Sequence, residues 1–192
     1  TSIMGIAFPN GTDIALTKLN ANGSALVGST FFGGSENDGQ GIYVNYGDET
    51  RGDIALTQQG DIIIGTSTAS SNLPGTSGRF QSNFGGAARD GFIAKFNSNL
   101  SLLNWASYFG GSANENLNGI KLDKNENIFI CGGTNSNNLK NRTNNFNGYF
   151  DGYIAKINSN ATQVIASRYF GTTDYDQAFL IDLDDNDNIV LF

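Results

Sequence analysis

The sequence contains no histidine, one cysteine, two prolines and one tryptophan among its 192 residues. Without histidine, a Ser-His-Asp triad, a Cys-His nucleophile and a histidine-ligated metal are excluded within this chain. The single thiol, Cys131, rules out an internal disulfide and a cysteine-rich zinc site, and it leaves the redox compartment open. These absences remove several common classes of enzyme.

Basic residues are scarce. Lysine and arginine total 11 against 18 aspartates and glutamates, which gives a net charge of -7. Nucleic acids and anionic lipids are bound through clustered cations, which this composition does not provide. No apolar run approaches the roughly 20 residues of a membrane-spanning helix. The sequence therefore predicts no nucleic-acid partner and no direct membrane insertion.

Glycine and asparagine are abundant, with 25 and 26 copies. Both residue types favour tight turns and left-handed backbone conformations over helix interiors. Hydrophobic residues make up 39% of the chain, which is enough to form a buried core. The composition therefore predicts a folded protein that is rich in turns and poor in helix.

The chain repeats itself. Residues 90–99 (DGFIAKFNSN) and 151–160 (DGYIAKINSN) share eight of ten residues at an offset of 151 - 90 = 61, and residues 13–22 share the Asp, the Lys and both Asn of this block. Shortly after each block comes an aromatic-Phe-Gly signature, at 31–34, 108–111 and 169–172. A fixed period of tens of residues indicates a repeat architecture.

Each repeat holds four short runs of apolar, β-branched and aromatic residues bounded by Asn, Gly, Asp or Ser, which is typical of strands and hairpins. Gly60, Glu126 and Asp187 occupy the same tip position of one hairpin turn, where a left-handed backbone is expected. Four-stranded antiparallel units at this period, with no helical period between them, predict an all-β fold built of β-propeller blades. In the second copy the runs are 91–96, 102–108, 119–122 and 128–132.

Residues 90–131 resemble the SBBP-type β-propeller repeat of bacteria. The matching features are an Asp-x-aromatic-Ile-Ala-Lys strand, an Asn-bearing turn, an aromatic-Phe-Gly-Gly strand end and a Gly-Ile-x-Leu-Asp strand. Residues 151–192 follow the pattern except at Thr172, and the first copy follows it once an insertion is removed. The resemblance implies a secreted or cell-surface protein of a Gram-negative bacterium, often a gliding species with type IX export. It implies no particular activity.

The repeat boundaries divide the chain into parts of four blades of one partial propeller. A closed ring needs roughly four to eight blades. We therefore expect the chain to be a piece of a larger propeller, with the remaining blades of its own full-length chain as its partners. Residues 1–34 form the outer part of one blade, 52–111 a second blade, 118–172 a third, and 178–192 begin a fourth.

Residues that recur in every copy are expected to be architectural, because each blade solves the same packing problem whereas a site is normally used once. Asp13, Asp90 and Asp151 each open a strand beside a turn, where a carboxylate can accept backbone N–H bonds. One stretch, 182–188, has the alternating Asp and Asn oxygens that Ca²⁺ prefers. The stretch is read as an ordinary hairpin turn or as a weak calcium site, with no other cofactor; the calcium ligands would be Asp182, Asp184, Asn186 and Asn188.

Positions that differ between blades are better candidates for contacts with a ligand or partner. One is the insertion at 43–51, which the matching link of the third blade lacks, and another is the loop 135–149, which contains a compact basic spot. Trp105 and Cys131 are also unique, but both lie on predicted strands and are expected in the core. The predicted contact residues are Tyr43, Tyr46, Asp48, Glu49, Arg51, Lys140 and Arg142.

No reactive constellation emerges from these patterns. The leading prediction is a non-catalytic extracellular propeller segment that acts as a scaffold or as an adhesion and recognition module of a larger bacterial surface or secreted protein. Its partners would be surface, secretion or motility proteins or glycans. A carbohydrate-active or other hydrolytic propeller is an alternative, and it requires unique carboxylates in one pocket. A cargo or structural component of a secretion or motility assembly is a third.

Overall fold

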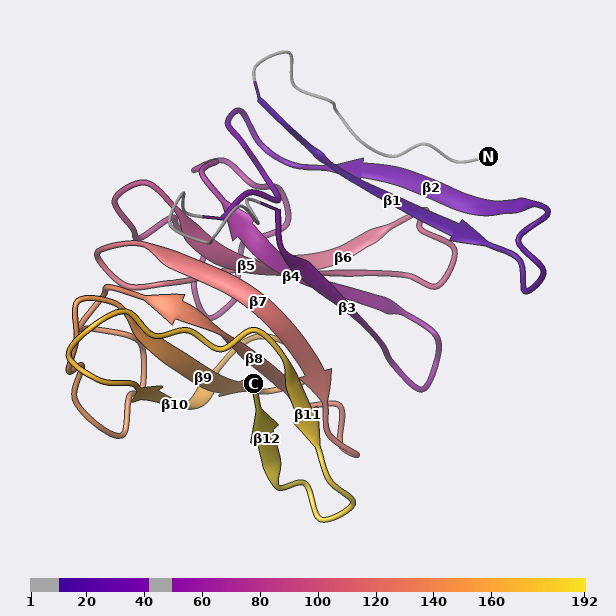
Figure 1. Ribbon diagram of the computed structural model, residues 1–192. Coiled ribbons are helices and arrows are strands. Elements are labelled where there is room, and N and C mark those ends of the chain that lie inside the picture. Colours follow the sequence, from indigo (N-terminus) through magenta and orange to yellow (C-terminus); the bar gives the residue numbers. More distant parts are fainter. Residues whose placement is uncertain (1–10, 42–49) are drawn as a thin grey trace.

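The computed structural model describes residues 11–41 and 50–192, which form four antiparallel β-sheets and contain no helix (Figure 1). Two sheets have four strands and two have two strands. The predicted all-β fold class, with four-stranded antiparallel units, is confirmed. None of the described segments is a helix long and apolar enough to cross a membrane.

Chain order and spatial order agree within every sheet, so each sheet is a meander of hairpins. One two-stranded sheet consists of β1 (Ile14–Leu19) and β2 (Leu26–Phe32), and the other of β11 (Ile181–Leu183) and β12 (Ile189–Leu191). The first four-stranded sheet consists of β3 (Gly52–Leu56), β4 (Ile62–Thr68), β5 (Asp90–Phe96) and β6 (Leu103–Phe109). The second consists of β7 (Glu115–Leu122), β8 (Ile128–Thr134), β9 (Asp151–Ile157) and β10 (Val164–Phe170).

The burial of each strand follows from its position. In β1, partly buried and exposed residues alternate along the whole strand, as expected where one face meets solvent. In β4 and β8 all seven residues are buried, because these central strands have neighbours on both sides and packed sheets on both faces. The β-branched and apolar composition of β4 and β8 fits this environment.

The hairpin turn between the first and second strand of a sheet recurs with the same backbone. Gly60, Glu126 and Asp187 have φ values of 81°, 61° and 62°, which confirms the left-handed conformation expected at these tips. A left-handed residue at the tip allows the short turn to match the twist of the two strands. The same geometry is therefore reached with three different side chains.

The turn between the third and fourth strand is held by asparagine side chains. Asn97 Oδ1 accepts the N–H of Ser101 at 2.9 Å, and Asn158 Oδ1 accepts the N–H of Thr162 at 2.9 Å. The same two amides donate to the hydroxyl groups of Ser101 and Thr162. Asparagine is frequent in this chain partly because its side chain accepts backbone N–H groups that have no backbone partner in these turns.

Successive sheets pack against one another, and the first strands β3, β7 and β11 lie side by side (Figure 1). The ring of Phe109 in β6 stacks on that of Tyr153 in β9, with 5.1 Å between the ring centroids. Trp105 and Cys131 are 6% and 0% exposed, which confirms their predicted place in the core. The core therefore lies between the sheets, as it does between the blades of a propeller.

The two-stranded sheets leave large apolar side chains in contact with solvent. In the four-stranded sheets the equivalent strands β4, β5, β6, β8 and β9 are mostly buried, whereas β10, the counterpart of β2, buries three of its seven residues. The exposed apolar side chains of β1, β2 and β12 are those of Leu19, Leu26, Val27, Phe31, Ile189 and Val190.

Candidate functional site

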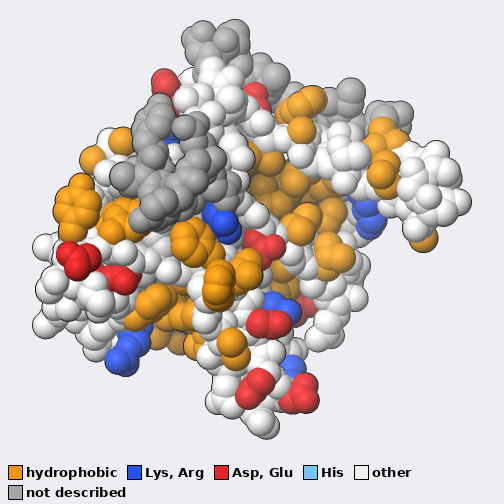
Figure 2. Space-filling view, viewed as in Figure 1, with side chains coloured by type: hydrophobic (Ala, Val, Ile, Leu, Met, Phe, Trp, Pro, Cys, Tyr) orange, Lys and Arg blue, Asp and Glu red, His pale blue; other side chains and the backbone are white. Residues whose placement is uncertain are grey.

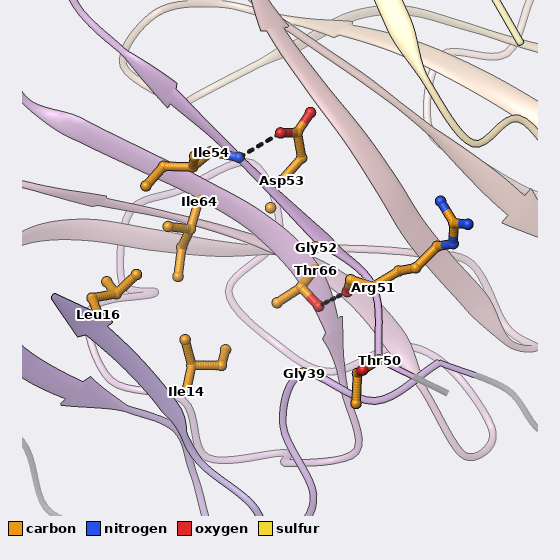
Figure 3. A pocket seen from close by; sticks show the side chains of 11 residues that line it. Ile14, Leu16, Gly39, Thr50, Arg51, Gly52, Asp53, Ile54, Ile64 and Thr66 are labelled. Atoms are coloured by element: carbon orange, nitrogen blue, oxygen red, sulfur yellow. Dashed lines mark hydrogen bonds between the residues drawn. The ribbon is translucent and has the colours of Figure 1, made fainter. Parts of the chain in front are cut away.

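A hollow of about 340 Å³ lies between β1 and β3. Figure 2 shows hydrophobic side chains gathered in it, beneath the β1–β2 sheet. Ile14 and Leu16 of β1 line one side, and Ile54 and Ile64 line the other (Figure 3). These four aliphatic side chains can pack against apolar groups, and none of them can act as an acid or a base.

Asp53, at the rim of this hollow, is turned towards the backbone. Its Oδ2 accepts the N–H of Ile120 in β7 at 3.0 Å, and its Oδ1 accepts the N–H of Ile54 at 2.8 Å (Figure 3). The carboxylate therefore joins β3 to β7 in the next sheet.

Arg51 is the one predicted contact residue of the insertion that the structure describes. Its side chain points away from Ile14 and Leu16 in Figure 3. The guanidinium carbon lies 4.5 Å from the centroid of the Phe179 ring, a cation–π contact that links the beginning of β3 to the segment before β11. The predicted residues Tyr43, Tyr46, Asp48 and Glu49 lie outside the described residues.

Lys140 and Arg142 lie on the same loop but have different surroundings. The Lys140 ammonium donates a hydrogen bond to the carbonyl of Phe80, in a loop of the preceding sheet. Arg142 is exposed and pairs with Ser167 of β10 through an isolated β-bridge. Residues 141–145 line a polar hollow of about 420 Å³. Lys140 thus has a structural contact, whereas the Arg142 side chain faces solvent beside this hollow.

The predicted calcium ligands form the turn between β11 and β12. Asp184 Oδ1 accepts the N–H groups of Asn186 and Asn188, each at 2.8 Å, and the Asn188 side-chain NH₂ donates to Asp184 Oδ2. Asp182 is turned to Lys121 of β7, with 2.7 Å between Nζ and Oδ1. The two asparagines therefore direct donors, not oxygens, at the carboxylate.

The pKa of Asp184 is lowered by the hydrogen bond from the Asn188 side chain, and the pKa of Asp182 is lowered by its bond with Lys121. Both shifts arise from partners within the chain. In the ranges 11–41 and 50–192, no three Cys, Asp or Glu side chains gather in a way that could hold a metal ion. The hydrogen bonds of this turn are those of an ordinary hairpin turn. Calcium binding at 182–188 is not tested by them and stays a prediction.

A second repeated acid lies at or before the start of the next sheet, and it is not among the residues predicted from the sequence. In each repeat this acid comes four residues after the Gly-Gly or Gly-Thr pair that ends the aromatic-Phe-Gly signature. The three acids are separated by 115 - 38 = 77 and 176 - 115 = 61 residues, which are the offsets of the repeat itself. The spacing was visible in the sequence. The carboxylates of Asp38, Glu115 and Asp176 accept the N–H groups of Gly34, Gly111 and Thr172 at 2.7, 3.0 and 2.6 Å.

Two of these acids, Asp38 and Glu115, each meet the acid that opens the preceding third strand. Asp90 Oδ1 and Glu115 Oε2 both lie within 2.7 Å of the point where a Cβ atom on Gly110 would stand. The equivalent acids Asp13 and Asp38 lie in the same way around Gly33, within 2.6 Å of that point. Only glycine leaves room for two carboxylates at this place. We call each such pair a carboxylate clamp.

Both acids of the second clamp are fully buried. Asp90 Oδ2 accepts the N–H of Gly85 at 2.8 Å, and Glu115 Oε1 accepts the hydroxyl hydrogen of Thr134 at 2.5 Å. Burial raises the pKa of Asp90 to about 6 and that of Glu115 to about 7, although these hydrogen bonds act in the opposite direction. The clamp therefore joins loops inside the protein and does not present its acids to a substrate.

Four-stranded antiparallel meanders that follow one another with their first strands side by side are the blades of a β-propeller. Residues 104–140 match the family model described as SBBP, Beta-propeller repeat, and this match confirms the resemblance to the SBBP-type repeat that is seen in the sequence. This segment covers most of β6, all of β7 and β8, and the beginning of the loop before β9. No curated protein matches the sequence.

Proposed function

We propose that the chain is a non-catalytic scaffold segment of an extracellular or cell-surface protein of a Gram-negative bacterium, with recognition contacts made by its variable loops. The observation that carries this proposal is the use of the repeated polar side chains. Those of the clamps and of the asparagine turns bind backbone groups of links and turns. They stabilise a repeating architecture on which loops can vary.

Ion pairs between strands serve the same purpose. Lys156 of β9 lies 3.1 Å from Asp123, in the turn before β8, and Lys121 of β7 lies 2.7 Å from Asp182 of β11. The first pair ties two hairpins within one sheet, and the second ties two successive sheets. Charged side chains that are used in this way support an architectural role for the repeat.

The hydrolytic alternative needs carboxylates that a substrate can reach. The acids that converge at Gly110 are both 0% exposed, and an equivalent pair converges at Gly33. A catalytic pair is normally open to solvent and used once. The burial and the repetition of the clamps therefore favour a scaffold over a hydrolase.

The loop 135–149 is the described segment best suited to recognition. Arg142 is exposed beside a polar hollow, several asparagine amides surround it, and Tyr149 is 73% exposed. A guanidinium, amides and an aromatic face together suit glycans or acidic protein surfaces. We assign the recognition contacts to this loop.

The cellular location is tested by labelling the source bacterium with an antibody raised against this chain, before and after the cells are permeabilised. Equal labelling of intact and permeabilised cells is expected. A signal that appears only after permeabilisation would overturn the extracellular assignment. Release of reducing sugar from cell-surface polysaccharides by the purified chain would contradict the non-catalytic role.

The recognition loop is tested by binding of the chain to isolated cell envelopes. The Arg142→Ala variant is expected to bind several-fold more weakly, whereas Arg168→Ala, an exposed arginine on β10, serves as the matched control. Equal binding by both variants and the unchanged protein would remove this loop from the proposal.

A further inference from the structure

Each turn between the third and fourth strand of a repeat contains two asparagines that are used differently. The first, at position 20, 97 or 158, uses both ends of its amide. Asn97, for example, accepts the N–H of Ser101 with Oδ1 and donates to the Ser101 hydroxyl group with Nδ2. The second comes two residues later, and its side-chain hydrogen bonds within the described chain all end at Oδ1. The turn therefore uses the oxygen of the second asparagine and leaves its nitrogen unused.

The second asparagine also begins the same short motif in all three turns. The turn between β1 and β2 is one of them, because residues 13–22 repeat 90–99 and 151–160. Asn-x-Ser/Thr, with any residue except proline in the middle, is the acceptor sequence for N-linked glycans in secreted proteins. The three acceptor sequences are residues 22–24 (NGS), 99–101 (NLS) and 160–162 (NAT).

We propose that Asn22, Asn99 and Asn160 are attachment sites for N-linked glycans, so that each described third-to-fourth-strand turn carries a saccharide. This inference rests on the extracellular location proposed above, because the acceptor sequence is used in secreted proteins. The glycosyl donor is a saccharide whose anomeric carbon is bound to the diphosphate of a polyprenyl lipid. The enzyme that transfers it is a glycosyltransferase of the export route.

The transfer forms one bond and breaks one bond. Nδ2 of the asparagine bonds to the anomeric carbon, and the bond between that carbon and the diphosphate oxygen breaks. The diphosphate leaves with the electron pair, and one Nδ2 proton passes to a base of the transferase. No atom is oxidised or reduced.

The hydroxyl group of each acceptor sequence is placed to assist this step. In the three turns, the Ser or Thr hydroxyl donates to Oδ1 of the asparagine at 2.6, 2.6 and 2.7 Å. When Nδ2 loses a proton, negative charge develops on Oδ1, and a hydrogen bond to Oδ1 stabilises this charge. The turn therefore holds the two side chains of the acceptor sequence in the arrangement that the transfer needs.

The acceptor asparagines are all exposed. The middle residue of the motif is turned the other way: Leu100 and Ala161 are 1% and 0% exposed, with left-handed φ values of 61° and 52°. Asn99 lies in a sheet that packs against the β1–β2 sheet on one side and against β7 on the other, and it is exposed between these neighbours. A transferase can therefore reach this side chain on the folded repeat.

A glycan at these positions leaves the contacts of the turn intact. The turns are fastened to the preceding sheet through backbone carbonyls: Lys18 Nζ donates to that of Ser98 at 2.7 Å, and Arg79 Nη1 donates to that of Asn160 at 2.9 Å. The asparagine itself contributes Oδ1 to the turn. Replacing one Nδ2 hydrogen by a sugar removes none of these bonds.

A fourth acceptor sequence, residues 141–143 (NRT), provides a control within the chain. Asn141 is exposed like the other three, but its Nδ2 donates to the carbonyl of Val164 at 2.5 Å. The Thr143 hydroxyl donates to the carbonyl of Ser167 at 3.1 Å and not to Asn141. Both groups that the transfer needs are thus occupied, and the fold excludes Asn141 as an attachment site.

Mass spectrometry of the protein purified from its source bacterium tests the proposal. Cleavage before aspartate places the four acceptor sequences on separate peptides, 13–37, 90–122, 123–150 and 151–173. Saccharide masses are expected on the first, second and fourth of these peptides and not on 123–150. Fragmentation by electron transfer is expected to place each saccharide on the asparagine. Unmodified peptides, a saccharide on Asn141, or attachment to a hydroxyl group would each overturn the proposal.

Variants at Ser101 test the role of the hydroxyl group. Ser101→Ala keeps Asn99 and is expected to lose the saccharide of peptide 90–122, while the saccharides at Asn22 and Asn160 of the same molecules show that the protein is folded and exported. Ser101→Thr is expected to keep it, because Thr162 occupies this place in the next repeat. Asn141→Gln is the matched control and changes no saccharide. A saccharide retained in Ser101→Ala would contradict the proposal.

The glycans and the cellular location can fail separately. Unmodified peptides from a protein that is labelled on intact cells would overturn the glycans alone. Saccharides on a protein that is labelled only after permeabilisation would overturn the surface location and keep the attachment sites.

Discussion

The carboxylates of Asp90 and Glu115 meet at one glycine, Gly110, although Asp90 begins β5 and Glu115 begins the next sheet at β7. Their oxygens lie within 2.7 Å of the place where a side chain on Gly110 would begin. Each carboxylate also accepts a backbone N–H from a loop. The link between two blades is therefore held by two buried carboxyl groups and their hydrogen bonds, at a position that admits no side chain.

Replacing this glycine tests how tightly the clamp is built. Gly110→Ala places a Cβ atom against both carboxylate oxygens, so one acid must move and lose hydrogen bonds inside the protein. We expect the free energy of unfolding to fall by about 2 to 4 kcal/mol, which is in the range of buried polar networks that are broken. Chemical denaturation measures this loss.

The control is Gly78→Ala. Gly78 has a φ of 73°, and a Cβ atom there would meet no atom within 4 Å, so the cost is only that of the left-handed backbone. We expect a loss of about 1 kcal/mol. Equal losses for the two variants would show that crowding at Gly110 contributes nothing.

The clamp also predicts how stability depends on pH. Burial raises the pKa of Glu115 from 4.5 to about 7, so the folded state holds this proton more tightly than the unfolded state. The stabilisation is fully present below about pH 4.5 and is lost as the pH rises through about 7. The Asp90 pKa, raised to about 6 by burial, acts in the same direction.

Glu115→Gln isolates this contribution, because the amide keeps the shape of the side chain and does not titrate. Between pH 4.5 and 8, the unfolding free energy of the unchanged protein is expected to fall relative to that of the variant by about 2 to 3 kcal/mol. Denaturation at several pH values provides the comparison. Parallel curves for the two proteins would contradict a buried, protonated Glu115.

The turn between β11 and β12 carries a prediction about calcium. Because N–H donors of Asn186 and Asn188 already point at Asp184, calcium would have to displace them to bind there. We expect the melting temperature to change by less than about 1 °C on addition of millimolar calcium. A larger rise that is lost in Asp182→Asn would instead establish the site predicted from the sequence.

Much of the fold could be predicted from the sequence because repeated sequence segments form the same strands and turns in each blade. The expected run 91–96 corresponds to β5, which begins one residue earlier, and the expected run 128–132 corresponds to β8, which continues to Thr134. The left-handed tips at Glu126 and Asp187 were found by alignment with Gly60. Local periodicity and turn chemistry are enough for such features.

The functional residues were harder to predict because their roles depend on contacts between blades. Nothing near Lys140 in the sequence indicates that its ammonium reaches the carbonyl of Phe80. Glu115 was not predicted although its spacing recurs, since a single acid among polar residues at the start of a strand gives no sign of being buried. Composition made 182–188 look like a metal site, whereas the orientation of Asn188 is decided only when the turn folds.

Tyr153 provides a test of a buried polar atom that lacks a partner. Its side chain is 0% exposed, and its hydroxyl group makes no hydrogen bond to any residue that the structure describes. Burial raises the pKa of this phenol well above its ordinary value, so it stays neutral. The equivalent residue in β5 is Phe92, which shows that the fold accepts a ring without the hydroxyl group.

We therefore expect Tyr153→Phe to increase the free energy of unfolding by about 1 kcal/mol, because an unsatisfied buried hydroxyl is costly. Tyr108→Phe is the matched control: the Tyr108 hydroxyl donates to the carbonyl of Ser70 and accepts the N–H of Leu73, both at 2.9 Å. Its loss leaves two buried backbone groups without a partner and is expected to cost about 2 kcal/mol. Equilibrium denaturation measures the free energy of unfolding of both variants. If Tyr153→Phe lost as much stability as Tyr108→Phe, the Tyr153 hydroxyl group would have a hydrogen-bond partner in solution, which would contradict the prediction.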